Sequence, residues 1–363
     1  MSSKLQYKGI ASFRGSHFEE VTKTLNVLGK NEDGSFEVRP NEVIVKVHSV
    51  SLNPADLVLH RSSWMMPFHK HLGIGSDYSG TIKGIGNAAK SKLGLNVEDQ
   101  VSGLYFHPLG EGALAEYLIL DLNNEGDCTV MKKPSRLSME EASSFPVILL
   151  TAYQMIREHL KEESYRKVLV IGGATSVGRA CVQLCRYFKV DEIHAVCSDK
   201  SAALVTNLGA HHIIDYKKHA NINKPVREAA REGRYDAILD CCGNRDLFGN
   251  IHEILKPKDE GAYYVTICGD SKYDYSTMSV VTLFMPMVRS CVRAFLSRFG
   301  LSSLDYLFLM MDPKKKDLET IKGLIEAGEL KLFLDEIFSY ADFRKAVAKL
   351  ESGKVSGKVV VRV

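Results

Sequence analysis

The stretch Leu169-Val-Ile-Gly-Gly-Ala-Thr-Ser-Val-Gly178 decides the fold of this chain. It joins an apolar, strand-like run to a helical pattern through a glycine-rich turn, and such turns bind phosphate groups. The usual pattern is Gly-x-Gly-x-x-Gly, whose middle glycine lets the backbone approach the phosphates closely. Counted back from Gly178, the outer glycine is Gly173 and the middle position holds Thr175. The turn is therefore a phosphate-binding pattern with one glycine replaced.

Beyond residue 151 the pattern alternates between short apolar runs and amphipathic stretches. A helix over 177–188 is predicted because apolar residues recur at i, i+4, i+7, i+8 and i+11, and a second helix over 200–208 ends at Gly209. Strands are predicted over 167–171, 192–197, 213–214, 234–243 and 262–269. This alternation is typical of a doubly wound parallel sheet. The glycine-rich turn then follows the first strand and opens the first helix, as a phosphate site requires.

The first part of the chain has a different pattern. Between residues 43 and 122, short strand-like runs are separated by glycines and turn residues, which predicts a partly open β-barrel. A length of 363 residues favours two domains, and the change of pattern near residue 151 marks their boundary. A helix over 342–350 and a strand over 359–363 close the chain. We predict an α/β protein with a barrel domain and a parallel-sheet domain.

The composition excludes several classes of protein. Hydrophobic residues make up 45% of the chain and charged residues 25%, as in an ordinary globular protein with a large core. The net charge of +3 is nearly balanced, so no nucleic-acid partner is expected. The eight cysteines form no Cys-x-x-Cys pair, which is typical of reduced intracellular cysteines. The sequence has no apolar leader and no apolar run of roughly 18 residues, so we expect a cytoplasmic location.

The replaced glycine does not abolish nucleotide binding. A helix N-terminus offers backbone N–H groups and a partial positive charge, both of which favour phosphate. Thr175 adds a Cβ that prevents the closest approach and a hydroxyl that can reach an oxygen held further out, directly or through water. The residues predicted to bind the cofactor at this turn are Gly172, Gly173, Thr175, Ser176, Val177 and Gly178.

The end of the second strand selects the nucleotide, because an acidic residue there would hold a ribose 2′-hydroxyl. If the strand ends at Cys197, the contacting residues are Ser198 and Lys200. A small polar residue beside a lysine suits a 2′-phosphate, so we prefer NADPH. A boundary shifted by one residue would instead make Asp199 the ribose ligand, which keeps NADH open.

Several stretches together resemble a known family. They are Ser51-Leu-Asn-Pro-Ala-Asp56, Gly73-Ile-Gly-Ser-Asp-Tyr-Ser-Gly80, Gly112-Ala-Leu-Ala-Glu-Tyr117, Phe145-Pro-Val-Ile-Leu-Leu-Thr-Ala-Tyr153, the glycine-rich turn and Gly353-Lys-Val-Ser-Gly-Lys-Val-Val-Val361. In this order they resemble the medium-chain dehydrogenase/reductase superfamily, and within it the zinc-free, quinone oxidoreductase-like branch, above all its fungal members. The resemblance implies a GroES-like catalytic domain over 1–150, completed by 325–363, and a Rossmann domain over 151–324.

The resemblance also implies roles for individual residues. Asn53 is the candidate catalytic residue, facing the nicotinamide and the substrate, although an asparagine before a proline is also a good turn former. Thr151 is expected beneath the cofactor and Tyr216 near the adenosine phosphate. Further cofactor contacts are expected at the ends of the fourth and fifth strands, at Cys242, Gly243 and Gly269.

The same comparison argues against a catalytic zinc, which needs three protein ligands and an open position. Where the zinc-dependent branch has a cysteine and a histidine, this chain has Asn53 and Ser76, and residues 105–117 contain no cysteine. The histidines that could bind a metal are His69, His71, His211 and His212. Because no cysteine or carboxylate partner is evident for them, we expect no metal site.

Hydride transfer without a metal depends on orientation, exclusion of water and hydrogen bonds to the developing oxyanion. The expected function is an NADPH-dependent, zinc-independent reductase of quinones or α,β-unsaturated carbonyl compounds. The alternative is a dehydrogenase-like binding or membrane-associated scaffold protein with little turnover.

Two further expectations concern partners. Relatives pair through the edge of the Rossmann sheet, so we expect a homodimer formed near the apolar strand that begins at Tyr263. Residues 279–311 are apolar and contain Arg289 and Arg293 one helical turn apart. They are either a pair of helices packed over the cleft, which we prefer, or a peripheral contact with an organelle or lipid-droplet surface, with the arginines reaching lipid headgroups.

Overall fold

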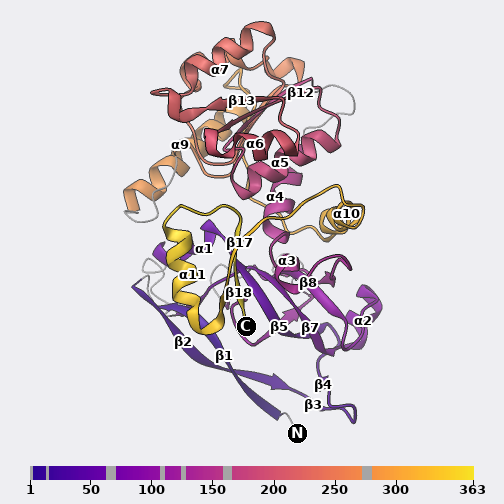
Figure 1. Cartoon of the computed structure of the whole chain (residues 1–363). Helices are drawn as coiled ribbons and strands as arrows, with labels where there is room; N and C mark the ends of the chain where they lie inside the picture. Colours follow the sequence, from indigo (N-terminus) through magenta and orange to yellow (C-terminus); the bar gives the residue numbers. More distant parts are fainter. Residues whose placement is uncertain are drawn as a thin grey trace. The chain divides into compact units, whose positions relative to one another are not determined.

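The computed structural model describes residues 3–13, 16–62, 71–106, 111–123, 128–157, 166–271 and 280–363 (Figure 1). The chain forms two compact units, unit 1 with residues 1–150 and 312–363, and unit 2 with residues 151–311. The chain returns to unit 1 at Asp312, ahead of the expected position 325. Helix α10 (Lys315–Glu326) belongs to unit 1 because its Glu326 carboxylate accepts hydrogen bonds from the backbone N–H and hydroxyl of Ser135, at 2.6 and 2.8 Å.

Unit 2 is built on a parallel sheet of six strands in the order β13-β12-β11-β14-β15-β16. The strands are β11 (Lys167–Ile171), β12 (Glu192–Cys197), β13 (His212–Asp215), β14 (Ala237–Asp240), β15 (Tyr263–Thr266) and β16 (Tyr306–Phe308). Counted along the chain this is the order 3-2-1-4-5-6 of a doubly wound nucleotide-binding sheet. All five residues of β11 are buried, as expected for a central strand covered on both faces. The predicted Rossmann sheet is confirmed.

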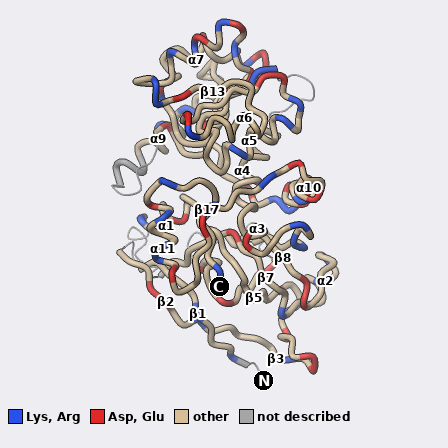
Figure 2. The backbone as a smooth tube through the Cα atoms, viewed as in Figure 1, with Lys and Arg blue, Asp and Glu red and all other residues tan. Residues whose placement is uncertain are grey.

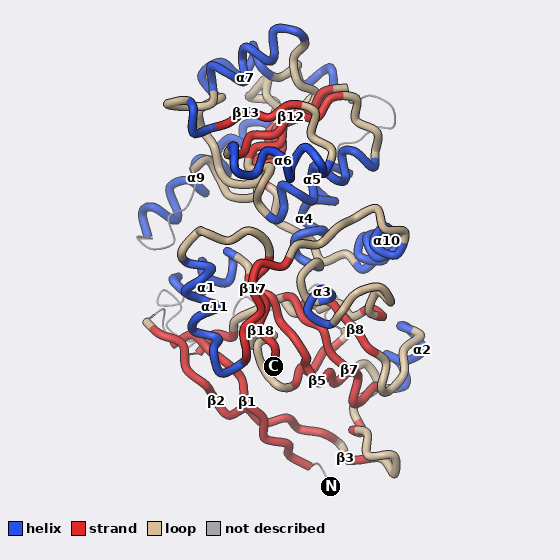
Figure 3. The backbone as a smooth tube through the Cα atoms, viewed as in Figure 1, coloured by secondary structure: helices blue, strands red, loops and turns tan. Residues whose placement is uncertain are grey.

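Helices connect successive strands of this sheet (Figure 3). They are α5 (Ser176–Tyr187), α6 (Asp199–Leu208), α7 (Asn223–Ala229), α8 (Ile251–Ile254) and α9 (Val280–Arg298), with the short 3-10 turn η2 (Tyr216–Lys218) after β13. Helices α5 and α6 lie within one residue of their predicted starts. A core cluster joins Leu169, Val196 and Ile238 of three adjacent strands to Ile251 and Ile254 of α8.

The last part of unit 2 differs from the sequence analysis in two respects. Helix α9 continues through Pro286, and the apolar run after it forms the edge strand β16 rather than a second helix. Strand β15, near which the dimer contact was expected, therefore lies second from the edge, because β16 pairs with it in parallel. The short length of β16 explains why its sequence gave no clear strand signal.

Unit 1 consists of mainly antiparallel sheets, in which β17 pairs in parallel with β18, and a few helices. Its strands are β1 (Ser3–Phe13), β2 (His17–Val27), β3 (Gly29–Lys30), β4 (Phe36–Glu37), β5 (Glu42–Leu52), β6 (His71–Gly73), β7 (Asp77–Ile85), β8 (Gln100–Leu104), β9 (Tyr117–Asp121), β10 (Met131–Lys132), β17 (Leu334–Ser339) and β18 (Lys358–Arg362). The largest sheet has the order β10-β8-β7-β5-β18-β17, with β9 also paired to β5. Strand β18 pairs antiparallel with β5, so the C-terminal strand closes a sheet begun by the first fifty residues.

The other helices are α1 (Pro54–Ser62), α2 (Asn87–Leu93), α3 (Met139–Ala142), α11 (Phe343–Glu351) and α4 (Pro146–Arg157), within which the boundary between the units falls. Figure 2 shows Lys and Arg interspersed with Asp and Glu along the backbone of both units. Within the described ranges, no helix combines the length and the apolar composition that crossing a bilayer requires.

Candidate functional site

The glycine-rich turn between β11 and α5 is tightly bonded to the neighbouring strand. Gly172 has φ +78°, and the N–H groups of Gly172 and Gly173 both donate to the Val196 carbonyl at the end of β12, at 3.1 and 3.0 Å. A Cβ on Gly178 would lie 2.1 Å from the Gly172 carbonyl oxygen. The last glycine of the pattern is therefore required for the close approach of helix to strand.

Thr175, the residue in place of the middle glycine, is the N-cap of α5. Its hydroxyl oxygen accepts a hydrogen bond from the Gly178 N–H at 3.0 Å, which satisfies one of the donors that a helix leaves unpaired at its start. The side chain is exposed. A phosphate can therefore meet the N–H groups of the first turn, at Ser176 and Val177, with the threonine hydroxyl beside them. The replacement keeps the helix start well formed, and the residues fit a nucleotide.

Strand β12 ends at the residue on which the NADPH prediction depends. The strand ends at Cys197, Ser198 is the N-cap of α6, and Asp199 is the first helical residue. A carboxylate in the first turn of a helix is favoured by the helix dipole, which gives Asp199 a structural role. Lys200 follows it and is exposed.

The end of β13 adds further charge to the same edge of the sheet. Tyr216 opens η2 with an exposed side chain, and Lys217 and Lys218 follow, both exposed. The Asp215 carboxylate accepts a hydrogen bond from the Lys217 N–H at 3.0 Å and lies 3.9 Å from the Lys218 ammonium. The Asp215 carboxylate is thus bonded within its own turn.

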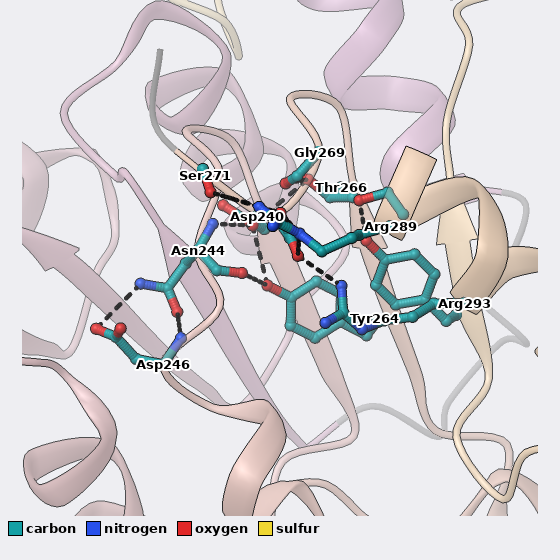
Figure 4. Close-up of polar contacts among 12 residues, drawn as sticks. Asp240, Asn244, Asp246, Tyr264, Thr266, Gly269, Ser271, Arg289 and Arg293 are labelled. Atoms are coloured by element: carbon teal, nitrogen blue, oxygen red, sulfur yellow. Dashed lines mark hydrogen bonds and ion pairs between the residues drawn. The ribbon is translucent and has the colours of Figure 1, made fainter. Parts of the chain in front are cut away.

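A buried carboxylate organises the turn after β14 (Figure 4). Asp240 accepts hydrogen bonds from the N–H groups of Cys242 at 3.2 Å, Gly243 at 2.9 Å and Asn244 at 2.8 Å, and from the Tyr264 hydroxyl at 2.9 Å. Burial raises its pKa to about 6, so the group remains an ionised acceptor at neutral pH. This one side chain fixes the predicted Cys242–Gly243 contact region, and sequence reasoning missed it.

The turn after β15 is held to the same carboxylate. The Thr266 hydroxyl lies 3.4 Å from Asp240 Oδ2 and 3.1 Å from the Gly269 carbonyl oxygen. Gly269 has φ +80°, and a Cβ there would lie 3.1 Å from the backbone of Pro286 in α9. The two turns are therefore coupled through Asp240 and Thr266.

Helix α9 is anchored to this turn by ion pairs with a buried carboxylate (Figure 4). The Asp270 side chain is buried and accepts hydrogen bonds from Arg289 Nε at 2.9 Å and Arg293 Nη1 at 2.9 Å. Burial alone would raise the pKa of Asp270, but the two arginines hold it below its usual range. Both arginines bond Asp270 while 38% and 29% of their side chains stay exposed, and the alternative in which they reach lipid headgroups stays a prediction.

Within unit 2 the predicted cofactor residues gather at the carboxyl ends of the parallel strands, where ligands bind in such sheets. A Cβ on Gly172 would lie 3.0 Å from Cys242 Cβ, so the first and fourth strands bring these two turns into contact. Thr151, in α4, is buried.

In unit 1, Asn53 belongs to a buried polar cluster. Its side-chain oxygen accepts from Lys358 Nζ at 2.6 Å, its amide nitrogen donates to Asp77 at 2.8 Å, and its backbone N–H donates to Asp56 at 2.6 Å. Lys358 and Asp77 also form a buried ion pair at 3.2 Å. Asp56, Asp77 and Lys358 each lie in one of the motifs that carry the family resemblance, which was the available signal for them.

This cluster does not fit a catalytic zinc. The Lys358 ammonium already lies against the amide oxygen of Asn53 and the carboxylate of Asp77, so a metal ion there would face a fixed positive charge. Ser76, the other residue at a ligand position, is a neutral hydroxyl and a poor zinc ligand.

The expectation that these histidines have no carboxylate partner is wrong. His212 does have a carboxylate partner, since its Nε2 lies 3.5 Å from Glu192 Oε1. His211 is engaged differently, because its Nδ1 accepts a hydrogen bond from the Ile193 N–H at 2.9 Å. His69 lies outside the described residues.

Comparisons with known proteins agree with this architecture. A family model of the alcohol dehydrogenase GroES-like domain matches residues 39–134, and one described as zinc-binding dehydrogenase matches residues 208–361. Protein YIM1 of Saccharomyces cerevisiae is 30% identical over 337 residues, covering 89% of this chain and 90% of that protein. Protein YIM1 of Vanderwaltozyma polyspora is 29% identical over 360 residues, covering 94% and 96%.

Among solved structures, the quinone oxidoreductase from Coxiella burnetii matches with a TM-score of 0.74 and 22% identity, covering 99% of this chain and 100% of that one. At this identity the likeness is one of fold. The GroES-like and Rossmann domains expected from the sequence are confirmed by these matches.

Proposed function

This chain belongs to the medium-chain dehydrogenase/reductase superfamily, and from that premise we propose that it is an NADPH-dependent reductase of quinones or α,β-unsaturated carbonyl compounds that works without zinc. One observation carries the proposal most: the buried Asn53–Asp77–Lys358 cluster holds an ammonium group where a catalytic cation would be needed. A quinone oxidoreductase among proteins of the same fold supports the substrate class.

Different residues of the chain have different roles in the proposed reaction. A reduced nicotinamide, when bound, supplies the hydride. The first turn of α5 binds its phosphates through backbone N–H groups, and Asp240 holds the neighbouring turns in place. An amide nitrogen carries two hydrogens, so Asn53 can donate to Asp77 and to a substrate oxygen at once. A donor fixed in this way stabilises negative charge as it develops on that oxygen.

Turnover tests this proposal directly. The full-length protein should oxidise NADPH when given a panel of quinones and enones, and a chelator should leave the rate unchanged, because no step depends on a metal. The measurement is the loss of NADPH absorbance, with and without prior chelator treatment. Loss of activity on chelation that added Zn²⁺ restores would contradict the zinc-free assignment. NADPH binding without oxidation of any panel member would favour the scaffold alternative.

Lys200 should determine the preference for NADPH. The proposal places its exposed ammonium near the 2′-phosphate, where a charge-assisted hydrogen bond contributes about 1.5–3 kcal/mol. Lys200→Glu should therefore weaken NADPH binding roughly ten- to a hundredfold and change NADH binding little. Calorimetric titration of both nucleotides measures this.

The control is Lys224→Glu, which makes the same charge change at an exposed lysine on α7. If Asp199→Ala weakens NADH while Lys200→Glu leaves NADPH binding as in wild type, Asp199 is the ribose ligand and the cofactor assignment is wrong.

A second candidate function, a membrane-associated scaffold, is favoured by one surface of α9. Met285, Val288, Val292, Phe295 and Phe299 are all exposed, with Phe295 at 56% and Phe299 at 63%. Their spacing of three and four residues puts the first four on one face of α9, with Phe299 directly after the end of the helix, and we call the five the α9 stripe. An apolar helix face of this kind can lie in a membrane interface. Because Arg289 and Arg293 bond Asp270, this candidate depends mainly on apolar contact.

Helix α9 packs on the edge strand β16 through the face opposite the stripe, since the buried Ser297 hydroxyl accepts a hydrogen bond from the Tyr306 N–H at 2.9 Å. Strand β16 is the edge strand of the sheet, and we retain a homodimer formed near this edge as part of the proposal. The protein is otherwise proposed to be cytoplasmic.

Phe295→Asp tests the membrane contact of the α9 stripe, and the mass of the wild type tests the dimer. In flotation with anionic liposomes, the wild type should float and the variant should stay in the soluble fraction, because the aspartate cannot enter the interface. Light scattering on the same samples reports the mass. Leu28→Asp, at an exposed leucine of unit 1, is the matched control. A wild type that stays soluble, or a variant that floats, removes the membrane contact, and a monomeric wild type removes the dimer.

A further inference from the structure

Three side chains capable of binding a metal meet at the start of β12 and β13. Glu192 is the first residue of β12, and His194 lies two residues on, so both point to the same face of the sheet. In the parallel register of the two strands His194 pairs with His212, the first residue of β13. The pairing places the second histidine beside the first, on that same face.

The atoms of this cluster are close enough to share one ion. Glu192 Oε1 lies 2.9 Å from His194 Nε2 and 3.5 Å from His212 Nε2, and the three ligand atoms all lie within 4.8 Å of one another. Around a tetrahedral zinc the ligand atoms are about 3.3 Å apart, from metal–ligand bonds of about 2.0–2.1 Å. Among the residues that the structure describes, no other group of His, Cys, Asp and Glu has this arrangement.

Neighbouring groups orient two of the three ligands. The Tyr235 hydroxyl lies 2.8 Å from His194 Nδ1, and this contact holds the buried ring with Nε2 toward Glu192. Lys167 Nζ lies 3.2 Å from Glu192 Oε2, so the other carboxylate oxygen, Oε1, is the one facing the histidines. Partners of this kind fix the rotamer and tautomer of metal ligands in proteins. The buried Tyr235–His194 contact distinguishes this cluster from an ordinary surface ion pair.

We propose that Glu192, His194 and His212 form a binding site for a divalent transition-metal ion of the zinc class. Two imidazoles and one carboxylate are a common zinc ligand set and leave a fourth position for water. The His212 side chain is 60% exposed, which gives the ion a path from solvent. The nearby Lys167 ammonium opposes the ion, so the affinity should be moderate.

The site lies at the amino ends of these strands, whereas the phosphate-binding turn and Ser198 lie beyond carboxyl ends. A bound ion would link the edge strand β13 to β12 and take no part in hydride transfer. The proposal is therefore independent of the reductase function, and chelator-resistant turnover is compatible with it.

Metal titration of the chelator-treated, full-length protein tests the site. Zn²⁺ should bind with about one equivalent per chain by calorimetry, Co²⁺ should give the visible absorption of a four-coordinate site, and Zn²⁺ should raise the melting temperature. His212→Ala removes an exposed ligand and should weaken binding at least tenfold and abolish the Co²⁺ band. The metal-free variant should keep the wild-type melting temperature and NADPH affinity.

His219→Ala is the matched control, because it removes another exposed histidine of unit 2 and should bind Zn²⁺ as the wild type does. Glu192→Gln should weaken binding as His212→Ala does. A wild type that binds no Zn²⁺, or a His212→Ala variant that binds it unchanged, overturns the site. Neither outcome would affect the NADPH oxidation assay, so this failure and a failure of the reductase proposal are distinguishable.

Discussion

Asp77→Leu should lower the free energy of unfolding of unit 1 by about 3–5 kcal/mol. The substitution leaves the Lys358 ammonium, which is almost fully buried, without its carboxylate partner at 3.2 Å. It also removes the acceptor of the Asn53 amide and of the Val147 N–H, at 2.8 and 2.7 Å. The Lys358 charge would keep only the neutral Asn53 amide oxygen at 2.6 Å, and two donors would lose their acceptor, which is costly for buried groups. The effect should be among the largest of any single substitution in unit 1.

Urea dependence of hydrogen exchange at the β5 and β7 amides measures this loss, because both strands belong to unit 1. Glu20→Gln is the control: it breaks the exposed Lys8–Glu20 pair at 2.9 Å and should cost about 0–1 kcal/mol. The double variant Asp77→Leu/Lys358→Met has no buried charge. Its loss should be smaller than the sum of the two single losses by more than about 2 kcal/mol. Additive losses would show that the pair is not coupled.

The helices and strands predicted most accurately are those with a strong local pattern of apolar residues. Strand β11 is apolar after Lys167, β12 ends in an apolar run after His194, and helix α5 has a clear amphipathic period after its glycine-rich turn. Strand β16 has three residues and was missed, because so short a run has no measurable period. The glycine pattern located the phosphate-binding turn, but the role of Thr175 as N-cap depends on where the helix begins.

The parts of the candidate site that escaped prediction all depend on contacts distant in sequence. Lys358 and Asp77 are separated by 281 positions and meet only because β18 pairs with β5 next to β7. Glu192 and His212 meet through the register of β12 and β13. The sequence correctly placed Arg289 and Arg293 on one helix face, yet it could not say which face is inward, since their partner Asp270 precedes the helix. Periodicity shows which residues share a helix face, but it does not show what that face packs against.

Asp240→Ala should destabilise unit 2 by about 3–5 kcal/mol and weaken NADPH binding at least tenfold. The Asp240 carboxylate is completely buried and is the acceptor for the N–H groups of Cys242, Gly243 and Asn244 and for the Tyr264 hydroxyl. Each buried donor left unsatisfied costs about 1–3 kcal/mol, and some will recover part of this from water. The turns that border the proposed cofactor site would lose their common anchor.

Hydrogen exchange of the β14 amides reports the stability of unit 2, and calorimetric titration with NADPH reports the binding. Asp246→Ala is the matched control, because this nearby carboxylate accepts hydrogen bonds only from the Ile222 N–H at 3.1 Å and the Asn244 side chain at 3.4 Å among the contacts described. Its less buried side chain should make the loss smaller, with NADPH binding close to wild type. If Asp240→Ala lost stability but bound NADPH with wild-type affinity, the turns after β14 and β15 would not contact the cofactor. The predicted contacts at Cys242, Gly243 and Gly269 would then be wrong, while the phosphate site at the start of α5 would stand on its own geometry.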